Sequence, residues 1–322
     1  MRKAFSAAGA IALAVAAGMA EAADLPSRKA PPDYIAPPIV SWTGLYVGLN
    51  AGGGFGGDGV HNSASDLYDN PQTVNGCPQY GPGPHCELVF MPAPSLFGAA
   101  GAASAVGNIP LDSSGFLGGG QIGYLWRFNS DFVAGVEADI QGTTLSGHGA
   151  GMGAGNPQYF GITVATVETA SKSVDYLGTA RARLGYLVTP SLLAYATGGL
   201  AYGGAHLSTS VAQGSQFPPG GFIVAPALGQ ASIADTRVGW TVGGGVEWMF
   251  SPNWSVKAEY LYYDLGVLTS NVALAGSGGI ATVNPPLYAD AVQSSTRFNG
   301  HIVRAGVNYH FNWAVAPVVA GY

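Results

Sequence analysis

Eight charged side chains stand in segments that alternate between polar and apolar residues, always at the polar positions. Four are acids and four are bases: Glu137, Asp139, Glu247, Glu259, Arg181, Arg183, Lys257 and Arg304. If these segments form one closed sheet, acids and bases at the same height meet in its interior, where an unpaired ion costs several kcal/mol. The sequence therefore predicts a network of ion pairs that seals the interior. The alternative left open is a narrow ion path lined with charge.

The heights of these residues above the nearest short turn also predict which of them pair. Equal heights place Glu247 with Lys257, Glu137 with Arg183 and Asp139 with Arg181. Directly opposed residues of antiparallel strands lie close enough for such pairs to form.

The remaining residue types offer little chemistry. The six histidines show no metal-ligand spacing of two or four residues, so no metal site is expected. The chain has no GxSxG, HExxH or phosphate-loop motif, and we expect neither catalytic residues nor a cofactor. Aspartate, histidine and serine residues are frequent in the connections, but residues this abundant can resemble a catalytic triad by coincidence.

Cys77 and Cys86 are the only cysteines of the chain. An exported protein folds in an oxidising compartment, so the two are expected to form a disulfide that closes a short loop. Two free thiols or a metal pair are the alternatives.

The elements that must position the charged residues read as β-strands. Eight segments show the alternation of period two that is typical of strands, and nearly all have the roughly 9–11 residues or more that a membrane-spanning strand needs. They lie around 44–51, 116–128, 132–141, 174–188, 192–203, 237–250, 254–263 and 301–311.

The connections between these segments alternate between short and long. Three are tight turns, at 128–132, 188–192 and 250–254, and four are long, at about 53–114, 142–173, 204–236 and 264–300. Short turns at one end and long loops at the other are typical of membrane barrels. We therefore predict an all-β fold: an eight-stranded antiparallel up-and-down transmembrane β-barrel with long external loops.

Aromatic residues gather at the short-turn ends of the segments, which is typical of an interfacial girdle. The expected girdle consists of Trp126, Phe128, Phe132, Tyr186, Trp248, Phe250, Trp254, Tyr309 and Phe311.

Composition and the N-terminal region agree with an exported membrane protein. Charged residues are only 9% of the chain, the net charge is −6, and a nucleic-acid-binding surface is therefore not expected. Residues 1–22 combine a basic start, an apolar stretch and small residues at a cleavage site, as in a secretory signal peptide. Residues 23–41 are expected to be a Pro-rich periplasmic linker, and 42–322 the outer-membrane barrel domain.

Several motifs resemble those of the alphaproteobacterial family of small, OmpA-like outer-membrane β-barrels, which are often called porin-like and include surface antigens. They include WTGLYVGLNAGGGFGG, GTARARLGY and the closing VRAGVNYHF. The resemblance implies a location in the outer membrane of a Gram-negative bacterium, with outer-membrane lipid and the outer-membrane assembly machinery as partners. That machinery reads a C-terminal aromatic residue, and Phe311 and Tyr322 are both candidates.

These observations predict a structural, surface-exposed barrel that contributes to envelope integrity and surface recognition, and no enzyme activity. A small-solute pore is the alternative. A surface haemin-binding protein is a second alternative, because some relatives are reported to bind haemin, and any other external ligand stays open.

Overall fold

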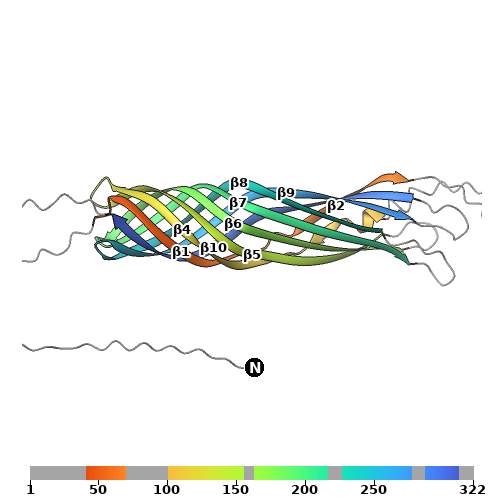
Figure 1. Cartoon of the computed structure of the whole chain (residues 1–322), viewed down its shortest axis with the longest axis horizontal. Helices are drawn as coiled ribbons and strands as arrows, with labels where there is room; N and C mark the ends of the chain where they lie inside the picture. The colour runs from red at the N-terminus through yellow and green to blue at the C-terminus, as the bar shows by residue number, and fades with distance from the viewer. Residues whose placement is uncertain (1–40, 70–100, 156–162, 217–226, 278–286, 312–322) are drawn as a thin grey trace, which may run out of the picture. The chain divides into compact units, whose positions relative to one another are not determined.

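The computed structural model describes residues 41–69, 101–155, 163–216, 227–277 and 287–311, which form ten β-strands (Figure 1). The strands are β1 (Gly44–Gly56), β2 (Val60–Asp69), β3 (Gly107–Ile109), β4 (Ser113–Arg127), β5 (Phe132–Gly155), β6 (Thr163–Thr189), β7 (Leu192–Gln216), β8 (Ala227–Ser251), β9 (Trp254–Ser277) and β10 (Leu287–Phe311). No helix among these residues is long and apolar enough to cross a membrane. The expected signal peptide, 1–22, and nearly all of the expected linker, 23–41, lie outside the described residues.

The sheet closes into a barrel because β1 pairs with β4 on one side and with β10 on the other. Between these two contacts the strands follow one another as β4-β5-β6-β7-β8-β9-β10, and every pairing is antiparallel. Eight strands therefore form the closed ring, which confirms the predicted up-and-down topology. β2 and β3 join only one half of it, where β2 continues β1 along β10.

The three predicted tight turns are confirmed. β4 ends at Arg127 and β5 begins at Phe132, β6 ends at Thr189 and β7 begins at Leu192, and β8 ends at Ser251 and β9 begins at Trp254. All three lie at the same end of the barrel, which Figure 1 shows at the left.

The predicted long external loops are largely wrong. Most of 142–173, 204–236 and 264–300 is strand, because β5 to β10 are each 24–27 residues long rather than 10–14. The first long connection, 53–114, also contains β2 and β3. The barrel therefore continues well beyond the thickness of a membrane at the end opposite to the tight turns.

The extra strand length escaped prediction because the polarity of the two strand faces inverts along the barrel. In the membrane-spanning part the inward positions include the charged residues and the outward ones are apolar. Farther along, the inward positions are apolar, such as Leu177 and Leu207, and the outward ones polar, such as Thr169 and Ser208. β9 also changes parity around Gly266, whose φ of 80° places it in the left-handed region.

Two groups of outward aromatic residues lie at the two edges of the apolar part of the wall. On β8, Trp248 lies near the tight turn and Trp240 eight residues farther along, and both are about half exposed. Eight residues of a tilted strand span about 20 Å, close to the ~25 Å apolar band of a membrane barrel. The apolar wall between these two levels is therefore the membrane-spanning part. We call the part of the barrel beyond Trp240 the outer half.

In the outer half the strands separate into two sheets. The β8–β9 ladder ends at Trp240 and Asp264, and within the described residues no pairing continues it toward the outer end. One sheet is β5-β6-β7-β8 and the other is β9-β10-β2-β3. Two apolar clusters fill the interior between them: the larger includes Val60, Leu145 and Phe298, and the smaller includes Ala105 and Val292.

Candidate functional site

The eight charged residues that the sequence singles out meet in one layer of the membrane-spanning interior. They come from five strands, β5, β6, β8, β9 and β10, and each points inward because it occupies an inward position of its strand. Seven of the eight side chains are fully buried, and the eighth, Arg183, is 1% exposed. The ions are thus removed from water and must be neutralised by one another.

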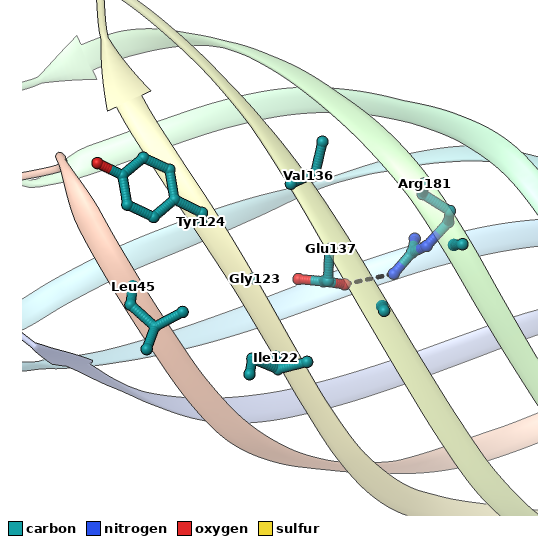
Figure 2. A pocket seen from close by; sticks show the side chains of 9 residues that line it. Leu45, Ile122, Gly123, Tyr124, Val136, Glu137 and Arg181 are labelled. Carbon is teal, nitrogen blue, oxygen red and sulfur yellow. Dashed lines mark hydrogen bonds and ion pairs between the residues drawn. The ribbon is translucent and has the colours of Figure 1, made fainter.

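Glu137 is the hub of this ion-pair layer. Its Oε1 lies 2.9 Å from the Lys257 ammonium and also contacts Arg181, while Arg304 is 3.6 Å away. Its Oε2 lies 3.0 Å from Arg183 Nη1 and accepts a hydrogen bond of 2.6 Å from the Tyr46 hydroxyl. Figure 2 shows the contact between Glu137 and Arg181. One carboxylate therefore meets all four cations of the layer.

Asp139 and Glu259 lie on the side of the layer that is nearer the outer half. Arg181 lies 3.0 Å from Asp139 and 2.9 Å from Glu259, and Arg304 lies 2.9 Å and 2.6 Å from the same two carboxylates. Thr179 donates a further hydrogen bond of 2.9 Å to Asp139. Both guanidiniums thus bridge two acids, a geometry that fixes the side chains as well as neutralising them.

Glu247 closes the layer on the side of the tight turns. It lies 2.7 Å from Arg183 Nη2 and accepts hydrogen bonds of 2.6 Å from Ser255 and from Asn308. The Arg183 guanidinium also stacks over the Tyr195 ring at 3.8 Å. Hydrogen-bond donors and an aromatic ring therefore complete the surroundings of Glu247 and Arg183, in addition to their ion pair.

The registers differ in part from the pairing that equal heights predict. Glu247 lies opposite Lys257 as expected, although the ammonium turns to Glu137. The other two cross-strand pairs are wrong, because β5 and β6 pair with Glu137 opposite Arg181, two residues away from the expected register. Long arginine side chains still reach the expected carboxylates, so Glu137 contacts Arg183 and Asp139 contacts Arg181.

Apolar side chains close the interior on both sides of the ion-pair layer. Toward the tight turns lies a buried cluster of Trp42, Tyr46, Leu125, Val133, Leu187, Leu193, Tyr195 and Met249. Trp42 is anchored there by a hydrogen bond of 2.9 Å from its indole nitrogen to the Pro190 carbonyl. Toward the outer half, Leu177, Leu261 and Ile302 begin the larger apolar cluster directly above the charges. The hydroxyls of Tyr46 and Tyr195 in the first cluster already donate to Glu137 and Glu259. An ion crossing this interior would therefore have to pass two largely apolar layers with little compensation for its lost hydration.

The outer half also buries polar side chains, and these lie apart from the ion-pair layer. Glu168 accepts a hydrogen bond from Asn62, and burial raises the pKa of its carboxyl. Lys172 donates to the Asp58 carbonyl at 2.8 Å, and burial lowers the pKa of its ammonium. Sequence reasoning missed both residues because it assigned their segment to a loop.

All nine residues of the expected aromatic girdle lie at the tight-turn end. Seven are 41–58% exposed, and Tyr309 and Phe311 are less so. Their rings contact one another, as between Trp254 and Tyr309 at 5.1 Å. Sequence reasoning missed the second group at the far side of the apolar wall, which includes Phe55, Phe116 and Trp240. Its signal was present, since each of these aromatics occupies an outward position about ten residues from the tight-turn end.

The other candidate sites are the cysteine pair, possible metal ligands and a recess on the outer wall. Cys77 and Cys86 lie outside the described residues, and their disulfide stays a prediction. Within the described ranges, no three His, Cys, Asp or Glu side chains group so that they could hold a metal ion. A recess of about 490 Å³ opens on the outer wall, where Ile122, Tyr124 and Val136 line it (Figure 2).

Comparison with known proteins agrees with this architecture. A family model described as "Outer membrane protein beta-barrel domain" matches residues 10–311. The 31 kDa outer-membrane immunogenic proteins of Brucella melitensis biotype 1 and Brucella suis biovar 1 are each 32% identical over 272 residues, covering 84% of this chain and 84% of each relative. The crystal structure of Neisserial surface protein A shares 15% identity with this chain, covering 84% of this chain and 98% of that one, with a TM-score of 0.25.

These similarities, together with the closed ring of strands and its apolar outer wall, place the protein in the outer membrane of a Gram-negative bacterium. The expected resemblance to a family of outer-membrane surface antigens is confirmed by the Brucella relatives. The chain belongs to the family of outer-membrane proteins built on a β-barrel domain.

Proposed function

We propose that this protein is a sealed structural barrel, which strengthens the outer membrane and holds its outer half above the lipid for recognition at the cell surface. It conducts no solutes and carries no catalytic site. The observation that carries the proposal is the balanced ion-pair layer, closed by an apolar cluster on each side.

The energetics of the interior favour sealing over conduction. The layer contains four acids and four bases, so its formal charge is zero and it offers no net attraction to ions of either sign. Every one of the eight charges already has an oppositely charged partner within 3.0 Å. A passing ion would have to displace these partners and would then meet the apolar layers without compensation. An eight-stranded barrel is also only wide enough to hold its own side chains.

The small-solute pore that the sequence leaves open would need a continuous polar path, and the apolar clusters argue against it. Haemin binding has little support in the described residues, because His61, His148, His206 and His301 lie on four different strands. His206 pairs with Asp175 at 2.7 Å, but no three His, Cys, Asp or Glu side chains in the described ranges group together.

Solute flux into proteoliposomes tests the proposal. Vesicles that contain the purified barrel are mixed with sugars of graded size, and swelling is followed by light scattering. A large general porin serves as the positive control. Swelling no faster than in protein-free vesicles is expected, whereas uptake that depends on solute size would overturn the sealed barrel and favour the pore.

A further inference from the structure

A row of aromatic rings lies on the outer wall where the apolar band ends. It consists of Trp240 on β8, Tyr260 and Tyr262 on β9, His301 on β10 and Phe55 on β1, and we call it the aromatic platform. Ring centroids are 5.3 Å apart between Trp240 and Tyr262, between Tyr262 and His301, and between His301 and Phe55. The platform therefore spans four neighbouring strands of the closed ring.

The platform is both fixed and accessible. The Tyr260 hydroxyl lies 2.6 Å from His301 Nδ1, and the two rings stack at 5.9 Å. Phe55, Trp240 and Tyr260 nevertheless remain 52%, 48% and 45% exposed. A general interfacial girdle needs only aromatic residues at the right height. Here the rings form one connected surface, and a histidine is held inside it.

A stripe of polar side chains continues from the platform into the outer half. On β10 the outward residues after His301 are Asn299, Arg297, Ser295 and Gln293, which we call the polar stripe. Asn299 donates to Asp58 at 2.6 Å and Gln293 donates to Asn271 at 3.1 Å. Arg297 is held by Asp264 at 2.6 Å, yet its side chain is 53% exposed. The stripe thus presents ordered hydrogen-bonding groups above the level of the lipid chains.

This combination fits a sugar. Aromatic faces pack against the C–H faces of a pyranose ring, and planar amide and guanidinium groups bond its hydroxyls in fixed directions. The opposite end of the barrel carries the tight turns, which are periplasmic in membrane barrels of this type, so the platform faces the outer leaflet. That leaflet is composed of glycolipid in Gram-negative bacteria, and the platform lies at the height of its first sugars.

We propose that the aromatic platform and the polar stripe bind the saccharide headgroup of one outer-leaflet lipopolysaccharide molecule. The first sugar rings lie against the platform, the following ones run along the polar stripe of β10, and the acyl chains cover the apolar wall below. The barrel is thereby anchored to the saccharide layer as well as to the lipid.

Native mass spectrometry of the detergent-solubilised barrel with rough-type lipopolysaccharide tests the proposal. The wild-type barrel should retain one lipopolysaccharide molecule and should release phosphatidylethanolamine, which has no sugar. The double variant Phe55→Leu with Trp240→Leu keeps an apolar wall but removes both ends of the platform, and we expect it to bind lipopolysaccharide about tenfold more weakly. A second variant, Arg297→Gln, keeps a donor for Asp264 and should also weaken retention.

The matched control carries the same kind of change at the other end of the barrel, Trp126→Leu with Phe132→Leu, and should bind as the wild type does. Heat-modified gel mobility shows that each variant is folded before it is compared. Equal retention by the wild type and both test variants would overturn the proposal, as would an equal loss in the control or equal retention of phosphatidylethanolamine. None of these results depends on whether the interior is sealed.

Discussion

Glu137 and Lys257 offer the sharpest test of the ion-pair layer, because the ammonium lies 2.9 Å from both carboxylate oxygens and both side chains are fully buried. Glu137→Gln keeps the shape of the side chain but leaves four cations facing three acids. Breaking a buried pair in this way costs about 3–5 kcal/mol. Lys257→Met leaves the opposite excess and should cost a similar amount.

The double variant restores the balance of charge, so its loss should be smaller than the sum of the two single losses. Groups in one ion-pair network show coupling of about 0.5–3 kcal/mol, and a value near 2 kcal/mol is expected here because the pair is fully desolvated. Urea unfolding in lipid vesicles, followed by tryptophan fluorescence, gives the free energy of unfolding of all four proteins.

The exposed pair of Arg237 and Asp235, at 3.4 Å, is the matched control. Its side chains are 33% and 50% exposed, and its coupling should not exceed about 1 kcal/mol. If the losses at Glu137 and Lys257 add within about 0.5 kcal/mol, the two residues do not act as a pair. A hydrated interior lined with charge would then be the better description.

Three further changes test the wall and the outer half, each by the same unfolding measurement. Ala182→Arg places a cation on the lipid face of β6 and should cost about 2–4 kcal/mol, whereas Thr169→Arg on the water-exposed part of the same strand should change stability by less than about 0.5 kcal/mol; equal effects would refute the membrane boundary. Gly199→Ala would push its new methyl group into the Ala180 carbonyl and should cost about 1–3 kcal/mol, so an unchanged barrel would contradict the close packing of β6 and β7. Burial raises the pKa of Glu168, so the folded barrel binds this proton more tightly than the unfolded chain does and loses stability as pH rises through the carboxyl range. The free energy of unfolding of Glu168→Gln should therefore rise relative to that of the wild type between about pH 4 and pH 7. A difference between the two proteins that does not change with pH would disprove this.

The membrane-spanning half of the fold could be predicted because its two strand faces differ strongly. Outward Val136 and Ile140 alternate with inward Glu137 and Asp139, and the tight turns between strands mark where each strand ends. The same alternation identified the eight residues of the ion-pair layer. Which residues of β5 and β6 lie directly opposite one another could not be predicted, because no tight turn joins these two strands and fixes their register.

The outer half was mistaken for loops for a physical reason. Outside the membrane the wall faces water, so outward serines and threonines replace the apolar residues that mark a membrane strand. Small inward residues such as Ala201 and Ala205 then give little contrast between the two faces. In β9 the change of parity at Gly266 breaks the period altogether. The aromatic platform depends on neighbours from four strands, and such neighbours become visible only once the registers are known.

Single-channel recording in planar lipid bilayers tests the central claim of a sealed barrel most directly. The folded wild-type protein, inserted in high salt under an applied voltage, should produce no openings above the bare-membrane baseline, because the ion-pair layer and the two apolar clusters close its interior. Stable, repeated steps of porin size from the wild-type protein would contradict the account and assign the protein to the small-solute pores.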